Sequence, residues 1–231
     1  MIKSKNHKTT CECLGRDKNA TNNHTMNAYI VEAVRTAVGK KNGSLSKWHP
    51  ADLGAVVLDE LVARSGIDAA QIDDVIFGCV SQVGAQGGNI GRMAVLASKL
   101  PESVPATSVD RQCGSSLQAL HFAAQAVMSG TNDVVIAGGV EVMSLVPIGA
   151  SIMDGMAANH GVPNNAQGIT KRYGDVVFSQ FEGAEMVAAK FDCSRAELDK
   201  LAFESHRRAD DAIKNGRFKR EIVAVSEAIF F

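Results

Sequence analysis

Short runs of apolar and β-branched residues recur along the chain, separated by longer segments with a different pattern. Such runs predict β-strands, because these side chains pack well on a pleated surface. The run at 133–139 is almost continuously apolar, which is typical of a strand buried on both faces. The predicted strands comprise residues 28–34, 73–80, 106–110 and 133–139, and the run at 221–225 indicates the start of another.

The segments between these runs carry apolar residues three or four positions apart, the spacing of one helix face. A helix is predicted at 50–65, where a proline suits the first position and the following glycine suits the end. A glycine-rich loop leads to a second helix at 92–100, and a third follows residue 113 and ends at Gly130. Strands alternating with helices indicate a layered α/β fold. The expected apolar face of the third helix comprises Leu117, Leu120, Ala124, Val127 and Met128.

The pattern changes after Pro147. Residues 148–180 contain five glycines and several asparagines without clear periodicity. Two further helices are predicted, one at 182–190 and one running from Ser194 to about residue 215. Ser194 and Glu197 have the spacing of a capping box, in which each residue satisfies a backbone N–H of the other at the helix start.

The first 25 residues are polar and asparagine-rich, and they contain neither an apolar run nor a periodic pattern. We therefore expect a disordered polar extension at 1–25, or a natural start at Met26. The remaining chain is divided by its pattern into an α/β domain at 26–147 and a second region at 148–231.

Composition and charge narrow the class of protein. The 231 residues are 45% apolar and 21% charged with a formal net charge of −1, which is ordinary for a globular protein and favours neither nucleic acid nor membrane insertion. No apolar run approaches the roughly 20 residues that span a bilayer. The five cysteines are odd in number and scattered, as expected in a reducing compartment such as the cytoplasm. Cys11 and Cys13 lack two further ligands at zinc spacing, so no metal site is expected.

Cys113 is the candidate for chemistry. It lies where a short predicted strand meets a long helix, and the positive end of the helix dipole and unpaired N–H groups favour the thiolate, which is the nucleophile. Gly114 beside it permits a close approach of backbone or ligand. From spacing alone a buried structural cysteine is the alternative. Cys79 follows an apolar run and is expected to be buried, and Cys193 has no obvious partner.

The wider pattern around Cys113 resembles the thiolase family. SVDRQCGSSLQALHFAAQAVMSG resembles the acyl-cysteine motif of that family, and AGGVEVMS at 137–144 resembles its second signature. IVEAVRTAVGKKNGSL resembles its first strand and turn, while GAEMVAAKF, SRAELDKLA and NGRFKREIV resemble its inserted loop domain. The resemblance covers nearly everything from Met26 to about Val225, with all motifs in order.

The resemblance implies a layered mixed sheet with helices, the N-terminal half of a thiolase at 26–147, and part of the loop domain at 148–231. It implies that Cys113 accepts an acyl group from a coenzyme A thioester, either in thiolytic cleavage of 3-ketoacyl-CoA, as in β-oxidation of fatty acids, or in the reverse condensation to acetoacetyl-CoA. Coenzyme A and acyl-CoA are then substrates, and no permanently bound cofactor is expected. The full-length family implies a homo-oligomer, a dimer or a tetramer.

Other residues near the motifs have expected roles. The backbone N–H of Cys113 is a candidate donor to the oxyanion. We expect Glu141 to be a buried, hydrogen-bonded carboxylate and Met143 to belong to the core or a turn. Arg111 and Gln112 are expected to fix the nucleophile turn or a subunit contact. Surface or packing roles are expected for the histidines His49, His121, His160 and His206.

Three departures from the family pattern bear on activity. Ser179-Gln180-Phe181 stands where the family commonly has His-Met-Gly, so the family's preference for acyl chain length cannot be transferred to this chain. Ser116 stands where the family often has glycine. The Gly-His-Pro, Asn-Glu-Ala-Phe and second-cysteine motifs of the family's second half do not occur in these 231 residues. The ending SEAIFF has the character of a truncation or frameshift. We therefore expect poor turnover by this chain alone, with a non-catalytic fragment and a β-ketoacyl synthase relative as the alternatives.

Overall fold

The computed structural model describes residues 1–3, 27–176 and 178–225. The chain divides into two compact units. The first comprises Met1–Ser151 together with the segment from Glu221 onward, and the second comprises Ile152–Arg220. This division lies four residues after the expected boundary at 147/148, and it returns the predicted strand at 221–225 to the first unit.

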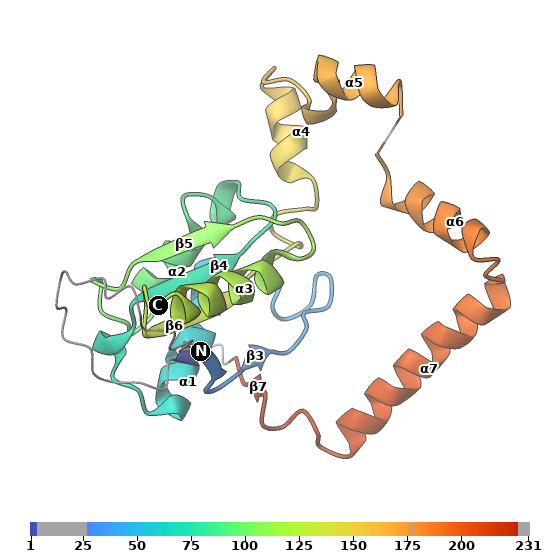
Figure 1. Ribbon diagram of the computed structural model, residues 1–231. Helices are drawn as coiled ribbons and strands as arrows, with labels where there is room; N and C mark the ends of the chain where they lie inside the picture. Colours follow the sequence, from blue (N-terminus) through green and yellow to red (C-terminus); the bar gives the residue numbers. More distant parts are fainter. Residues whose placement is uncertain (4–26, 177, 226–231) are drawn as a thin grey trace, which may run out of the picture. The chain divides into compact units, whose positions relative to one another are not determined.

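The first unit is built on a mixed five-stranded sheet. Strand β4 pairs in parallel with β5 and β6, and β1 pairs antiparallel with β2 and β6. The mixed sheet and its covering helices confirm the expected α/β fold class (Figure 1). In spatial order the strands are β2 (Tyr29–Ile30), β1 (Ile2–Lys3), β6 (Val134–Gly139), β4 (Asp74–Gly78) and β5 (Ala106–Val109).

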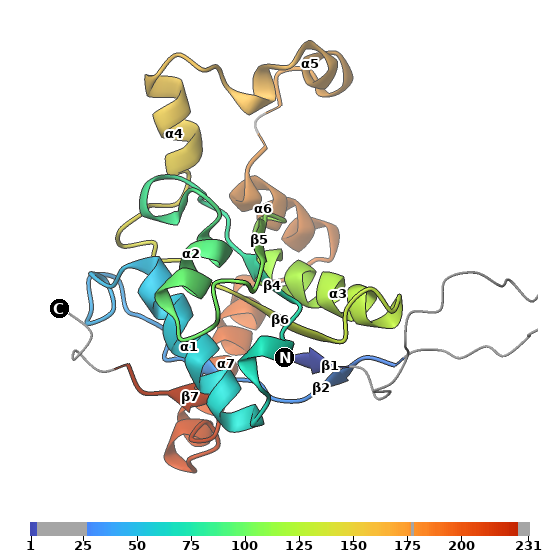
Figure 2. The same ribbon diagram turned by 90° about the vertical axis from the view of Figure 1, so that its left-hand side faces the viewer.

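Helices cover both faces of this sheet (Figure 2). Helices α1 (Pro50–Ser65) and α2 (Ile90–Ala97) pack on one face, where Val75 and Phe77 of β4 lie in their core cluster. Helix α3 (Ser115–Met128) packs on the other face, where Ile76 lies in a second cluster. Successive residues of a strand point to opposite faces, so an uninterrupted apolar run serves both clusters.

The N-terminal residues differ from the expectation for the extension at 1–25. Ile2 and Lys3 form β1 in the interior of the sheet, opposite Val135 and Val134 of β6, and Met1 and Ile2 are buried. An apolar pair at the very start of the chain is too short to produce a periodic signal, so the sequence pattern could not reveal this strand. Residues 4–25 of the predicted extension lie outside the described residues.

Helix α1 has the predicted bounds, and Gly66 ends it in the left-handed conformation at φ 66°. Helix α2 begins two residues earlier than predicted, because the side chain of Asn89 accepts the backbone N–H of Arg92 and sets the start. Of the strand predicted at 28–34, only Tyr29 and Ile30 form a strand, β2. A separate short strand, β3 (Arg35–Thr36), pairs in parallel with β7 (Ile222–Val223). Short 3-10 helices occur at Ala69–Gln71, Gly84–Gln86 and Pro163–Asn165.

The predicted apolar face of α3 was wrong in part. The helix buries a narrow face of small residues, Ala119, Ala123 and Val127, against the sheet. Leu117 and Met128 remain more than half exposed. Helical spacing alone is compatible with burial of either set of residues. The small residues are the buried ones, because alanine side chains let the helix approach the sheet closely.

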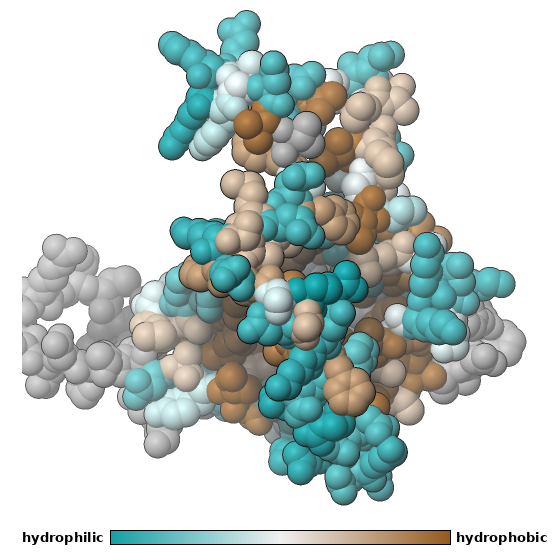
Figure 3. Space-filling model, turned by 90° about the vertical axis from the view of Figure 1, so that its right-hand side faces the viewer, coloured by the Kyte–Doolittle hydropathy of each residue, from teal (hydrophilic) through white to brown (hydrophobic). Residues whose placement is uncertain are grey.

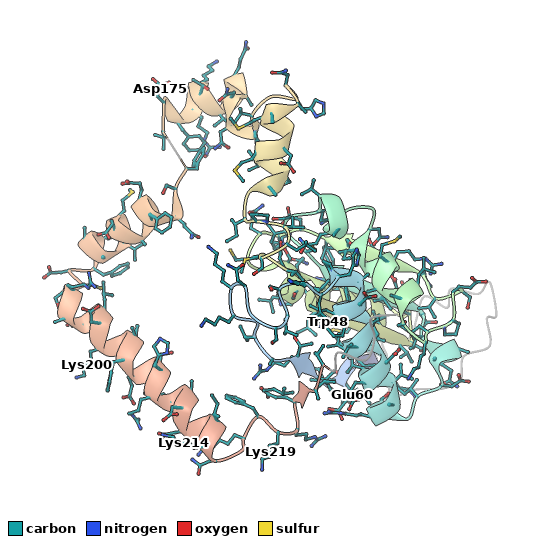
Figure 4. All side chains as sticks on the ribbon, turned by 180° about the vertical axis from the view of Figure 1, so that it is seen from behind. Trp48, Glu60, Asp175, Lys200, Lys214 and Lys219 are labelled. Atoms are coloured by element: carbon teal, nitrogen blue, oxygen red, sulfur yellow. The ribbon has the colours of Figure 1, made fainter. Side chains whose placement is uncertain are left out.

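In the described residues of the second unit, the regular elements are all helices. Helix α4 (Ala150–Ala157) leads into it and is followed by α5 (Gln167–Tyr173), α6 (Gln180–Lys190) and α7 (Arg195–Lys214). Helices α4 and α5 lie where the sequence showed no periodicity, and none of the described residues of α5, α6 and α7 is buried. Hydrophilic side chains cover much of α7 in Figure 3, and Lys200 and Lys214 project from it in Figure 4.

Candidate active site

Cys113 lies in a tight turn between β5 and α3, and hydrogen bonds hold this turn in a strained conformation. Gln112 has φ 48°, a left-handed value that residues other than glycine adopt only when their surroundings impose it. A carboxylate oxygen of Asp110 accepts the N–H of Gln112 at 2.6 Å. The buried Ser115 hydroxyl donates to the carbonyl of Gln112 at 2.6 Å and accepts the N–H of Arg111 at 3.0 Å. The turn therefore lifts the Cys113 side chain to the surface, where it is exposed.

The N–H groups at the start of α3 are used differently from the expectation. Gly114 donates its N–H to the carbonyl of Arg111 at 3.1 Å, and Ser115 donates to Gln112 at 3.0 Å. The sequence pattern had indicated unpaired N–H groups facing the thiol. Instead, these two donors are engaged within the turn. Backbone hydrogen bonds within the turn thus satisfy these N–H groups, and no side chain caps the start of α3.

Two glycines allow the Cys113 turn to approach the sheet. A Cβ at Gly78, the last residue of β4, would collide with the backbone of Ser115 and Ser116. A Cβ at Gly139, the last residue of β6, would collide with the hydroxyl of Ser116 and would lie 2.5 Å from the carbonyl oxygen of Gly78. The strand ends β4 and β6 thus carry glycine because α3 begins directly above them. Ser116 is accommodated only because residue 139 has no side chain.

A small pocket opens beside the thiol. It has a volume of about 210 Å³ and is lined by Cys113 together with Gly78, Val80, Gln112, Ser115, Ser116, Gly139, Val140 and Glu141. A larger hollow of about 790 Å³ in the same unit lies between the 34–46 segment, α1 and β6, and Cys113 is not among the residues that line it. The chemistry, rather than the size of the cavity, therefore identifies the smaller pocket as the candidate site.

The wall of this pocket is fixed by Glu141 and by a residue that sequence reasoning did not single out, Gln86. The Glu141 carboxylate accepts the N–H groups of Val80 at 3.0 Å and Ser81 at 2.9 Å. Gln86 is completely buried; its amide donates to the carbonyl of Ser81 at 2.9 Å and accepts the N–H of Val142 at 2.7 Å. Glu141 is hydrogen-bonded as expected, but the residue is exposed at the pocket, not buried. A glutamine in a Gly-rich loop gives no periodic or motif signal.

The structure separates the cysteines by environment. Cys79, directly after β4, is 1% exposed, as the apolar run predicted. Burial, followed by the negative charges of Glu141 and Asp110, raises the pKa of the Cys79 thiol to about 12, so it stays protonated at neutral pH. Cys113 and Cys193 are both exposed free thiols. Of the two, Cys113 is the one that lies in a pocket lined by glycines and hydrogen-bonded loops.

None of the histidines in the described residues lines the Cys113 pocket. His121 is exposed on α3, eight residues along from Cys113, and His160 and His206 are exposed in the second unit. His49 has a role that its sequence position did not reveal, because its Nδ1 accepts the N–H of Ala51 at 3.2 Å and caps α1. Among the described residues no group of three or more His, Cys, Asp and Glu side chains could hold a metal ion.

Comparisons with known proteins agree on one family. The family model for the N-terminal domain of thiolase matches residues 28–229. A steroid 3-ketoacyl-CoA thiolase of Mycobacterium tuberculosis is 49% identical over 199 residues, which are 86% of this chain and 49% of that protein. A 3-ketoacyl-CoA thiolase of Pseudoalteromonas translucida is 40% identical over 203 residues, again 86% of this chain and 49% of that protein.

Solved structures lead to the same fold. The crystal structure of a Bacillus anthracis acetyl-CoA acetyltransferase superposes with a TM-score of 0.69 at 30% identity, over 87% of this chain and 52% of that chain. The chain thus spans about half the length of the relatives it matches. In the described part of the chain no helix has the length and apolar character needed to cross a membrane.

Proposed function

This chain belongs to the thiolase family, and from that membership we propose that Cys113 is the nucleophile that accepts an acyl group from a coenzyme A thioester. The observation that carries the proposal is the position of the thiol: an exposed cysteine on a strained strand–helix turn, opening into a pocket of about 210 Å³. An acyl-accepting thiol needs this access, because the carbonyl carbon that it attacks must come within bonding distance of sulfur.

The proposed transfer takes place in two steps. With a 3-ketoacyl-CoA, the Cys113 thiolate attacks the 3-keto carbon, a carbon–sulfur bond forms, and the keto oxygen becomes an oxyanion. When the oxyanion collapses, the bond to the leaving group breaks. With a 3-ketoacyl-CoA the leaving group is the enolate of acetyl-CoA, which takes up a proton, and the acyl group stays on Cys113. The thiolate of a free coenzyme A then takes the acyl group and restores the cysteine. The reverse sequence is the condensation.

The chain's own residues have defined parts in this proposal. Asp110 and Ser115 hold the turn at Gln112 and so fix where the sulfur lies. The backbone N–H of Cys113 is the proposed donor to the oxyanion. Substrates of the 3-ketoacyl-CoA class are proposed from the relatives, two of which are 3-ketoacyl-CoA thiolases. We further propose a homo-oligomer and a reducing, cytoplasmic setting, which suits the free thiols Cys79, Cys113 and Cys193.

Site-specific acylation tests the proposal. The 231-residue chain is incubated with acetoacetyl-CoA or acetyl-CoA at mildly alkaline pH, and peptide mass mapping locates the acyl group. We expect acylation at Cys113 and none after Cys113→Ala, while Cys193→Ala retains it. Acylation of Cys193 at the same rate as Cys113 would mean that exposure alone explains the reactivity, and the proposal would fail. Full turnover is expected to be slow in this chain, because the family's second-half histidine and cysteine motifs do not occur in it.

A further inference from the structure

We propose that Gln86 is a positioning residue for acyl transfer: it holds the two loops that form the wall of the Cys113 pocket without itself touching the substrate. This inference rests on the proposed function of Cys113. Gln86 does not line the pocket, and its side chain is fully buried behind it. A glutamine with no exposed surface is unusual, because its amide group must find partners for both its donor and its acceptor atoms.

Both ends of the Gln86 amide are used, and each binds a different pocket loop. Nε2 donates to the carbonyl of Ser81 at 2.9 Å, in the loop that follows β4. Oε1 accepts the N–H of Val142 at 2.7 Å, in the segment that follows β6. One planar group therefore sets the spacing between the two loops, and residues of both loops, Val80 in the first and Val140 and Glu141 in the second, line the pocket beside the thiol.

Glu141 completes the arrangement from the pocket side. Its carboxylate accepts the N–H groups of Val80 and Ser81, and Gln86 Nε2 lies 3.4 Å from one of its oxygens. Of the two side chains, Glu141 lines the pocket and is exposed there, whereas Gln86 is buried behind it and donates to its carboxylate. The group that faces the substrate is thus oriented by a neutral side chain that cannot titrate.

Three variants separate positioning from simple stability. Gln86→Met keeps the length and burial but removes the donor and the acceptor. Gln82→Met is the matched control: Gln82 is an exposed glutamine of the same loop whose amide donates to the carbonyl of Cys79 at 3.0 Å and which does not line the pocket. Gln86→Glu keeps an acceptor for Val142, but as a carboxylate it loses the donor and faces Glu141; protonation restores the donor.

The measurements are the rate of acylation of Cys113 by acetyl-CoA, amide hydrogen exchange at Ser81 and Val142, and the midpoint of thermal unfolding. For Gln86→Met we expect acylation to fall about tenfold to a hundredfold in the folded chain, as for small misplacements near a reacting group, with faster exchange at both amides. Gln82→Met should match the wild-type chain in both. For Gln86→Glu, acylation relative to wild type at the same pH should recover as pH falls and the new carboxyl becomes protonated.

The outcomes separate the two proposals. If the wild-type chain takes no acyl group at Cys113, the proposed function fails, and hydrogen exchange at Ser81 and Val142 still decides whether Gln86 orders the wall. If the wild-type chain is acylated and Gln86→Met is acylated equally fast, the positioning role is overturned. A lower unfolding midpoint with unchanged acylation and no pH-dependent recovery in Gln86→Glu would assign Gln86 a structural role only, which also overturns the inference.

Discussion

Cys113 and Cys193 occupy the same place relative to a helix: each lies two residues before the first helical residue, Ser115 of α3 and Arg195 of α7. Both thiols are exposed. By helix position alone the two would be equivalent nucleophiles, because a helix start offers the same dipole and the same kind of N–H groups to each. Their surroundings make the difference.

The start of α7 is complete within its own sequence. The Ser194 hydroxyl accepts the N–H of Glu197, and the Glu197 carboxylate accepts the N–H of Ser194 at 2.9 Å, which confirms the predicted capping box. The N–H of Ser194, and its hydroxyl, which lies 2.8 Å from the same carboxylate oxygen, lower the pKa of Glu197 by donating to the carboxylate. The negative charge of Glu197 therefore already lies at the positive end of the α7 dipole. Cys193 therefore stands beside a helix start that is already satisfied.

The start of α3 depends on the rest of the first unit. No side chain caps Gly114, and the turn at Gln112 is held by Asp110 and Ser115 over two glycine strand ends. A thiol at a helix start therefore becomes a candidate nucleophile when tertiary packing exposes it in a pocket. At α7, by contrast, the Ser194–Glu197 capping box satisfies the helix start, and the neighbouring Cys193 has no comparable surroundings.

The largest expected effect is the contrast in thiol reactivity. With limiting iodoacetamide near neutral pH and peptide mapping, we expect Cys113 to be labelled first among the described cysteines. Cys79 should be about a thousandfold slower than an ordinary cysteine, since its pKa of about 12 leaves far less thiolate than the usual value of about 8.5. Unfolding in urea should abolish the difference. Preferential labelling of Cys193 or Cys79 in the folded chain would contradict the comparison.

A glycine pair tests the close packing under α3. Gly139→Ala should destabilise the first unit by about 1–3 kcal/mol, the usual cost of forcing extra atoms into a packed site, because the new Cβ collides with Ser116 and Gly78. Gly183→Ala in α6 is the control, since nothing lies within 4 Å of its added Cβ; it should stabilise that helix by about 0.5–1 kcal/mol. Urea unfolding followed by circular dichroism measures both. Equal effects at the two sites would show that α3 is not packed as described.

The cap of α7 should have a smaller and purely local effect. Ser194→Ala removes the hydroxyl of the capping box and should cost about 1 kcal/mol of helix stability. Amide exchange should increase in the first turn of α7, while acylation of Cys113 and exchange in α3 stay unchanged. Ser129→Ala, at the C-terminal end of α3, is a matched serine control. If Ser194→Ala changed the acylation rate of Cys113, the two helix starts would not be independent.

The smallest effect concerns acid. Hydrogen bonding and charge from Arg207 lower the pKa of Glu204 to about 2. Because the folded pKa lies below the unfolded value of about 4.3, this interaction stabilises α7 above the unfolded pKa and is lost as pH falls through about 2. A carboxyl-carbon NMR titration should show this low midpoint, and Arg207→Gln should move it upward. Because the pair is accessible to solvent, added salt should weaken it.

Local chemistry allowed much of the first unit, and the start of α7 in the second unit, to be predicted. The bounds of α1, the strands at β4 and β6, the capping box of α7 and the burial of Cys79 all depend on neighbours within a few residues, and sequence patterns report such neighbours directly. The thiolase resemblance around Cys113 came from contiguous motifs, and the family comparison confirmed it.

Features that depend on distant residues escaped the sequence. Strand β1 forms from Ile2 and Lys3 only because β2 and β6 offer pairing partners on either side. Helix spacing could not distinguish the small buried face of α3 from its larger exposed residues, since closeness to the sheet decided between them. Helices α4 and α5 showed no periodic signal, in part because α5 buries no residue at all.

The α/β class, the thiolase family and the position of Cys113 at a strand–helix junction could all be predicted from the amino-acid sequence. Tertiary structure alone decided that the turn at Gln112 is strained, that Gly78 and Gly139 make room for α3, and that Gln86 ties together two loops more than fifty residues apart. The reason is the separation along the chain over which each kind of interaction acts. Propensity, capping and motif spacing act over a few residues, whereas a pocket wall is built by hydrogen bonds and steric limits between segments that only the fold brings together.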